Sequence, residues 1–223
     1  MDGANPRQYF DPKPQSASRP KPIQLTLPDR TIGLTTDSGV FSGGAVDAGT
    51  KYLLLDAPEP PAEATNLLDL GCGYGPIAIT LALRAPQATV WAVDVNERAV
   101  KLCESNAIAA GATGVRAFVA ASPSHASAAG MPSEVQFDAI YSNPPIRIGK
   151  PALRNLLTGW LSRLTPDGHA YLVVQKHLGS DSLAQWLIES GWPTCRIGSR
   201  SGFRLLDVTT AQDTVAPAND GTP

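Results

Sequence analysis

Residues 67–76, LLDLGCGYGP, constrain the fold of this chain more than any other stretch. The mostly apolar residues 67–70 predict a short buried strand. The alternate glycines that follow predict a tight turn, because glycine adopts positive φ and lets the backbone approach a ligand closely. Pro76 suits the first turn of a helix, and the free amides at a helix start favour a polar or anionic group over the turn. Dinucleotide sites and purely structural connections use similar glycines, so the turn alone leaves its ligand open.

Strand and helix patterns alternate from this turn onward. The strands are expected at 67–70, 89–93, 115–120, 137–141, 170–174, 194–197 and 203–209, and the helices after Pro76 and at 96–110, 152–164 and 182–190. We expect the helix at 152–164 to stop at the Pro-Asp-Gly of residues 166–168. The alternation predicts a Rossmann-like α/β fold, with a seven-stranded, mostly parallel sheet and helices on both faces. Ligands of such sheets bind at the carboxyl ends of the strands, near the topological switch point.

The chain before the glycine turn follows a different pattern. Residues 1–22 contain five prolines among polar residues, which predicts a mobile arm. A β-hairpin is expected at 23–27 and 31–35, and a short helix at 51–55. We therefore expect a single domain at 23–210, with a hairpin and cap at 23–60 and a core at 61–210, followed by a disordered tail at 211–223.

Asp94 ends the strand that follows the glycine turn. A carboxylate at this place can accept hydrogen bonds from both ribose hydroxyls of an adenosine-containing cofactor. The structural alternative is that Asp94 caps the helix that follows it.

Asn143-Pro144-Pro145 directly follows another predicted buried strand. The two prolines end the sheet and remove two N–H donors, which leaves their carbonyls as acceptors. The Asn143 side chain adds a further carbonyl. Together these groups can accept both hydrogens of a planar amine or amide –NH₂, which directs the nitrogen lone pair at an electrophile without a strong general base.

Composition excludes some classes of function. The three cysteines and three histidines are scattered, so we expect no disulfide framework and no metal site. There is no apolar run of about 18 residues and no signal-peptide pattern at the start, which predicts a cytoplasmic protein with no membrane contact. The net charge is −2, yet residues 147–204 hold eight Lys and Arg against three acidic residues. That excess fits either a phosphate-binding face or an ordinary solvated surface.

Taken together, the motifs resemble those of class I S-adenosylmethionine (SAM)-dependent methyltransferases. Residues 69–75, DLGCGYG, resemble the first motif of that family, Asp94 its ribose-binding acid, and 143–145 its amine-methylating motif. Within the family the chain is most similar to the small-domain group of ribosomal RNA guanine-N2 methyltransferases. That similarity lies in DSGVFS at 37–42, DAGT at 47–50 and NPPIRIGK at 143–150. The resemblance implies SAM as the cofactor of the core at 61–210, guanine N2 as the methyl acceptor, and ribosomal RNA or a ribosomal subunit as the partner.

The resemblance also implies a role for each matching position. The catalytic residues would be Asn143, Pro144 and Pro145. The cofactor-binding residues would be Asp69, Gly71, Cys72, Gly73, Gly75, Asp94, Val95, Ser122, Asn143 and Phe41, and the substrate-binding residues Ile146, Arg147 and Lys150. Two positions depart from the family pattern, because position 146 is often aromatic and position 122 is often Asp or Asn.

Three alternatives remain open at this point. A protein glutamine N5-methyltransferase would act on an amide with the same –NH₂ geometry. A nicotinamide-dependent oxidoreductase would explain the glycines and Asp94 but not Asn-Pro-Pro. A non-catalytic module that binds SAM or RNA is the third alternative.

Overall fold

The computed structural model describes residues 16–42, 44–122 and 126–211. Most of the predicted arm at 1–22 and nearly all of the predicted tail at 211–223 lie outside these ranges. The described end of the arm contacts the rest of the protein. Ser18 Oγ donates to Asp37 Oδ2 at 2.6 Å, the Arg19 amide donates to the same carboxylate, and Arg98 donates to the Ser16 carbonyl at 2.8 Å.

An antiparallel hairpin and a short helix precede the core, as predicted. The hairpin consists of β1 (Lys21–Thr26) and β2 (Thr31–Thr36). Helix α1 (Ala48–Asp56) begins before the expected 51–55. It begins there because the Asp47 carboxylate accepts the amides of Gly49 and Thr50 at 2.8 and 3.1 Å, which caps the first turn.

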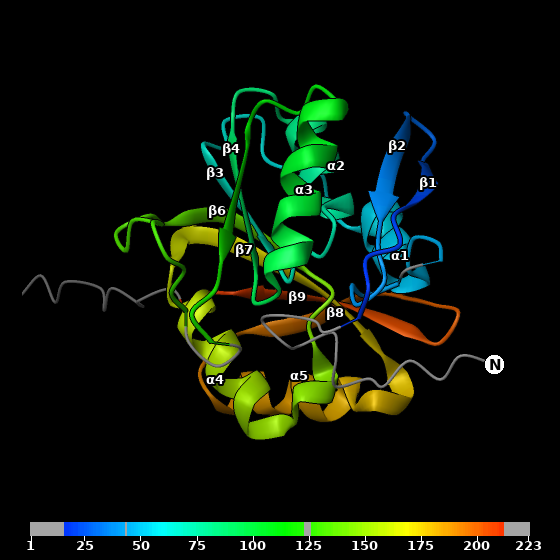
Figure 1. Ribbon diagram of the computed structural model, residues 1–223. Helices are drawn as coiled ribbons and strands as arrows, with labels where there is room; N and C mark the ends of the chain where they lie inside the picture. The colour runs from blue at the N-terminus through cyan, green and yellow to red at the C-terminus, as the bar shows by residue number, and fades with distance from the viewer. Residues whose placement is uncertain (1–15, 43, 123–125, 212–223) are drawn as a thin grey trace, which may run out of the picture.

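The described residues form the predicted seven-stranded sheet, in the order β5-β4-β3-β6-β7-β9-β8 (Figure 1). Its strands are β3 (Asn66–Leu70), β4 (Thr89–Asp94), β5 (Val115–Val119), β6 (Phe137–Ser142), β7 (Leu164–Gln175), β8 (Thr194–Arg200) and β9 (Phe203–Thr209). Pairing is parallel from β5 to β7 and antiparallel for β9 and β8. The helices of the core are α2 (Pro76–Arg84), α3 (Glu97–Ala109), α4 (Lys150–Leu161) and α5 (Ser180–Glu189), with short 3₁₀ turns η2 (Ile146–Ile148) and η3 (Lys176–Leu178).

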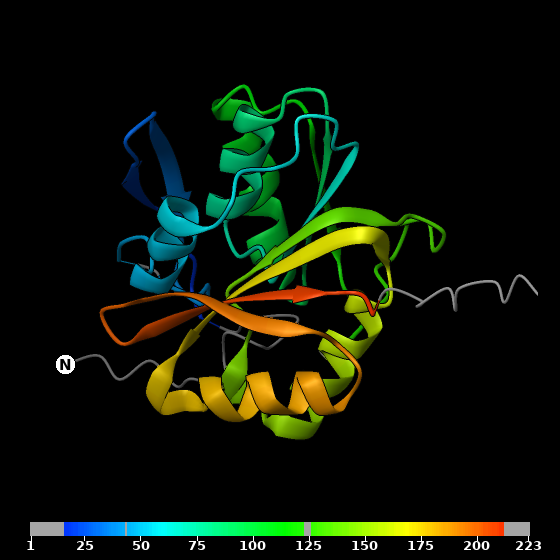
Figure 2. The same cartoon turned by 180° about the vertical axis from the view of Figure 1, so that it is seen from behind.

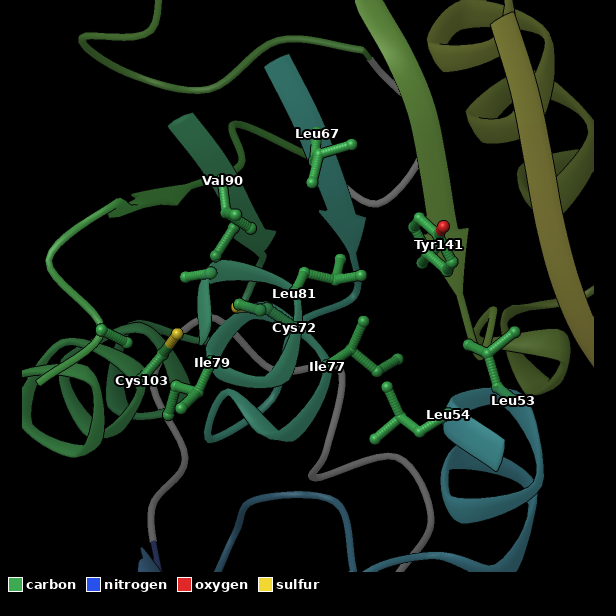
Figure 3. Close-up of a cluster of buried hydrophobic side chains, with 14 of the residues drawn as sticks. Leu53, Leu54, Leu67, Cys72, Ile77, Ile79, Leu81, Val90, Cys103 and Tyr141 are labelled. Carbon is green, nitrogen blue, oxygen red and sulfur yellow. The ribbon is translucent and has the colours of Figure 1, made fainter. Parts of the chain in front are cut away.

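The helices cover both faces of the sheet (Figures 1 and 2). Helices α1 to α3 and the hairpin share one buried apolar cluster with the first face, and α4 and α5 share a second with the other. In the first cluster Leu53 and Leu54 extend from α1 toward the residues of the core, which include Ile77 of α2 and Tyr141 of β6 (Figure 3). These contacts fix α1 against the sheet. Among the described helices, none is long and apolar enough to cross a membrane.

One predicted boundary is wrong. Helix α4 ends at Leu161 rather than continuing to 164, and β7 begins at Leu164, so the Pro-Asp-Gly of 166–168 lies inside a strand. Strand pairing overrides the turn signal because Leu164 pairs with Phe137 and the register shifts between Phe137 and Ala139. Gly168 makes this irregularity possible, since a Cβ there would lie 2.9 Å from the Phe137 carbonyl oxygen.

The strand order places the topological switch point at the centre of the sheet. The chain runs outward from β3 to β4 and β5, then returns to β6 on the other side of β3. The two central strands are joined at their ends, where Ser142 Oγ donates to the Leu70 carbonyl at 2.6 Å. The glycine turn after β3 and the Asn-Pro-Pro segment after β6 therefore start side by side, where ligands of such sheets bind.

Candidate active site

A pocket of about 280 Å³ lies at this switch point. Its walls come from the glycine turn, the end of β4, the Asn-Pro-Pro segment and the loop at 40–42. The structure thus brings together the motifs that the sequence analysis assigned to one site. Of the residues predicted there, Phe41, Gly71, Cys72, Gly73, Asp94, Val95, Ser122, Asn143, Pro144, Pro145, Ile146 and Arg147 line the pocket, whereas Asp69, Gly75 and Lys150 do not.

The three glycines of the turn serve two different purposes. All three have positive φ, at +82° for Gly71, +54° for Gly73 and +95° for Gly75. A Cβ at Gly71 or Gly73 would meet nothing within 4 Å, so the backbone there is open to the pocket that both residues line. A Cβ at Gly75 would lie 2.8 Å from Cys103 Sγ. Gly75 therefore lets α2 pack against α3, while Gly71 and Gly73 leave room for a ligand.

Asp69 lies behind the pocket wall. Its side chain is completely buried, and Oδ2 accepts the Ala78 amide in the first turn of α2 at 2.8 Å. Among the described residues Oδ1 has no hydrogen-bond partner. Burial raises the pKa of Asp69 to about 8. The residue thus holds the start of α2 beneath the turn, and the geometry gives no contact with the pocket to support the predicted cofactor-binding role.

Asp94 lies at the pocket and is held by two backbone amides. Oδ2 accepts the Gly73 amide and Oδ1 accepts the Asn96 amide, each at 2.9 Å. The helix cap that the sequence left as an alternative for Asp94 is instead Asn96, which accepts the amides of Arg98 and Ala99. Burial raises the pKa of Asp94. The carboxylate is positioned at the end of β4, with lone pairs beyond those two bonds to accept further donors.

The Asn143 side chain, at the end of β6, forms hydrogen bonds to the start of α1. Its Nδ2 donates to Asp47 Oδ2 at 2.8 Å and to Thr50 Oγ1 at 3.1 Å. The Pro144 carbonyl accepts the Ile146 amide at 2.8 Å, which leaves one of its two lone pairs. The DAGT motif at 47–50 carries part of the family resemblance, but neither Asp47 nor Thr50 is among the predicted site residues, although both line the pocket.

Basic residues lie on the side of the pocket formed by η2 and α4. Arg147 lines the pocket itself, and Lys150 lines a smaller hollow beside it together with Arg154 and Ile146. Phe41, 49% exposed, lines the pocket from the loop at 40–42. Sequence reasoning missed Gln175, which lines the pocket from β7. Its position at the end of the predicted strand 170–174 was the only available signal. Phe203 of β9 also lines the pocket, and it is one of two rings, with Phe41, that the sequence offers to stack on a target base because position 146 is not aromatic.

Comparisons with known proteins agree with this arrangement. Residues 31–206 match the family model described as methyltransferase small domain. The chain is 36% identical over 198 residues to YbxB, an uncharacterised protein of Bacillus subtilis, with 89% of this chain and 96% of that protein covered. It is 35% identical over 167 residues to ribosomal RNA small subunit methyltransferase C of Shewanella halifaxensis, with 73% of this chain and 46% of that enzyme covered.

A solved structure shows the same fold. It is the Thermus thermophilus 16S rRNA N2 G1207 methyltransferase in complex with AdoMet and guanosine, with a TM-score of 0.69 at 22% sequence identity. The similarity covers 86% of this chain and 50% of that one. The chain therefore spans about half the length of these two ribosomal RNA methyltransferases.

Proposed function

The chain belongs to the methyltransferase small-domain family of SAM-dependent methyltransferases, and we propose that it methylates the exocyclic amine of guanine, N2, in ribosomal RNA. One observation carries the proposal: the glycine turn with Asp94 and the Asn-Pro-Pro segment face a single pocket. The glycine turn and Asp94 suit an adenosine-containing methyl donor, and the Asn-Pro-Pro segment suits a flat –NH₂ acceptor.

The pocket fits SAM. The open backbone at Gly71 and Gly73 gives space for a ligand in close contact, and Asp94 is held with acceptor capacity suited to ribose hydroxyls. Val40, Ile77 and Ala99 add apolar surface to the same pocket. SAM supplies a methyl group bound to a positively charged sulfur, which needs only a correctly directed nitrogen lone pair.

Asn143 and Pro144 would direct that lone pair. The Oδ1 atom of Asn143 and the remaining lone pair of the Pro144 carbonyl would each accept one hydrogen of the guanine amine. The positive charge that develops on nitrogen is then spread over two preorganised acceptors. Catalysis by this route consists of positioning and electrostatic stabilisation, which agrees with a site whose acceptors are amide and carbonyl oxygens rather than a strong base.

The basic residues beside the Asn-Pro-Pro segment, where the methyl acceptor would bind, favour RNA as the substrate. Arg147 of η2 lines the main pocket, and Lys150 and Arg154 of α4 line the smaller hollow, which shares Ile146 with it. Phosphates flanking a target nucleotide would be neutralised there, with the guanine itself flipped out or unstacked to enter the pocket. The relatives that are named as ribosomal RNA methyltransferases support the same substrate class.

The test is to map N2-methylguanosine in ribosomal RNA from cells with the gene, without it, and with the gene restored as Asn143→Ala. We expect one guanine to lose its methyl group in the deletion and in the Asn143→Ala strain, and to regain it with the wild-type gene. Calorimetry on the purified wild-type protein and on the purified Asn143→Ala variant should show that both bind SAM and that neither binds NADH. Unchanged ribosomal RNA together with methylated glutamine in a cellular protein would refute the RNA substrate.

A further inference from the structure

The segment at 47–50, DAGT, places a second layer of hydrogen bonds behind Asn143. Asp47 Oδ2 accepts three donors: the amides of Gly49 and Thr50, at 2.8 and 3.1 Å, and Asn143 Nδ2, at 2.8 Å. Thr50 Oγ1 accepts the same Asn143 nitrogen at 3.1 Å. Helix capping accounts for the first two bonds but not for the two that cross 96 and 93 residues of chain to reach Asn143.

These bonds determine which end of the Asn143 amide faces the pocket. An ionised carboxylate only accepts hydrogen bonds, so the end of the amide next to Asp47 has to be the –NH₂ group. The two hydrogens of Nδ2 are then used by Asp47 and Thr50. Oδ1 is left as the polar atom of this side chain that can meet a ligand.

The orientation matters because the side-chain torsion of an asparagine does not by itself favour one orientation of the amide. The terminal torsion of asparagine is broad and roughly two-fold, so little energy separates the two orientations of an unsupported amide. With the amide reversed, an –NH₂ group would face the –NH₂ of the acceptor. Two donors would then oppose each other, and the lone pair would not be directed.

We propose that Asp47 is a positioning residue, which with Thr50 holds the Asn143 amide so that its oxygen accepts the target amine. The inference rests on the proposed function, since it assigns Asn143 the role of acceptor.

The helix that carries Asp47 is itself firmly placed. Leu53 and Leu54 bury their side chains in the core beside Ile77 (Figure 3). A Cβ at Gly49 would lie 2.6 Å from a ring carbon of Phe203 on β9, so only glycine permits this close approach. The start of α1 is therefore fixed against β9. Since β9 belongs to the same sheet as β6, Asp47 is held within hydrogen-bonding distance of Asn143 at the end of β6.

Three variants separate positioning from capping. Asp47→Ser keeps an oxygen that caps α1, but it is too short to reach Asn143. Thr50→Val removes only the second acceptor and keeps the branched shape. Asp47→Asn keeps an oxygen in the place of Oδ2, because the amides of Gly49 and Thr50 need an acceptor there. That oxygen can still accept Asn143 Nδ2, so this variant removes the charge of residue 47 but keeps the contact.

We expect Asp47→Ser to lower kcat about tenfold, with the Kd of SAM and the KM of RNA changed less than about twofold. This loss is smaller than the ~10²–10³-fold drop typical when a preorganised polar partner is removed outright. Thr50→Val should show a smaller loss of the same kind. Asp47→Asn should keep a kcat within about threefold of the wild type, because its oxygen can still accept Asn143 Nδ2. Equal activity of Asp47→Ser and wild type, or a loss in Asp47→Asn as large as in Asp47→Ser, would overturn the inference.

A substrate-free measurement keeps this test apart from that of the proposed function. The side-chain amide signals of Asn143, identified by their loss in Asn143→Ala, should exchange slowly with deuterium in the wild type and rapidly in Asp47→Ser. Rapid exchange in the wild type would overturn the positioning role. A wild-type protein that methylates no guanine yet protects this amide would instead refute the proposed function and leave the held orientation intact.

Discussion

Replacement of Asp69 by asparagine should flatten the dependence of stability on pH. Burial raises the pKa of Asp69 to about 8 from an ordinary value of 3.8. Between these two values the folded protein keeps a proton on Asp69 that the unfolded chain has lost. Each rise of one pH unit in that window therefore lowers the free energy of unfolding by about 1.4 kcal/mol. From pH 5 to pH 7 the wild type should lose roughly 2–3 kcal/mol through this group alone.

Asparagine at position 69 does not titrate, yet its Oδ1 can still accept the Ala78 amide. The –NH₂ group of the new asparagine takes the place of the aspartate Oδ1, which has no hydrogen-bond partner among the described residues. A buried –NH₂ without an acceptor lowers the stability of the variant at pH 5. The difference in slope is independent of that offset. Urea unfolding at pH 5, 6 and 7 should show the variant gaining about 1.4 kcal/mol on the wild type per unit. Parallel stability curves would refute the buried, proton-bound state of Asp69.

Three other predictions concern the pocket. Asn143→Ala should keep SAM affinity and lower turnover ~10²–10³-fold in a filter assay with labelled SAM; wild-type turnover would refute its role. Asp94→Ala should weaken SAM binding by about 1.5–3 kcal/mol in calorimetry, and unchanged affinity would leave Asp94 only its bonds to the backbone. Both Gly73→Ala and Gly75→Ala strain a positive φ, but Gly75→Ala should lower the melting temperature more, because its new Cβ would also meet Cys103 Sγ, and Gly73→Ala should weaken SAM binding more, because Gly73 lines the pocket. Equal effects of the two glycine changes on both quantities would contradict the division of roles in the turn.

Features set by neighbouring residues were predictable from the sequence. The strand, turn and helix around Gly71 follow from local patterns. The rule that the carboxyl ends of parallel strands share one sheet edge placed Gly71 and Asn143 at the same edge. The burial of Asp69 was available too, because side chains alternate along β3 and position 69 shares a face with Leu67, under α2. The match of residues 69–75 to the family motif assigned Asp69 to the cofactor, against the alternation along β3.

Features that depend on distant partners were not predictable. The end of α4 is decided by the pairing of Leu164 with Phe137, which no local propensity contains. The contact of Asp47 with Asn143 spans 96 residues, and a short motif cannot indicate which distant side chain it will meet.

The close approach of Gly49 to Phe203 has a consequence for the timing of folding. Residues 47–50 lie far from β9 in the sequence, although Gly49 and Phe203 are in close contact in the folded protein. Contacts between such distant parts of a chain form late, after the cost of closing a long loop has been met. The hydrogen bonds that hold the Asn143 amide are therefore expected to form late in folding, after β9 has joined the sheet.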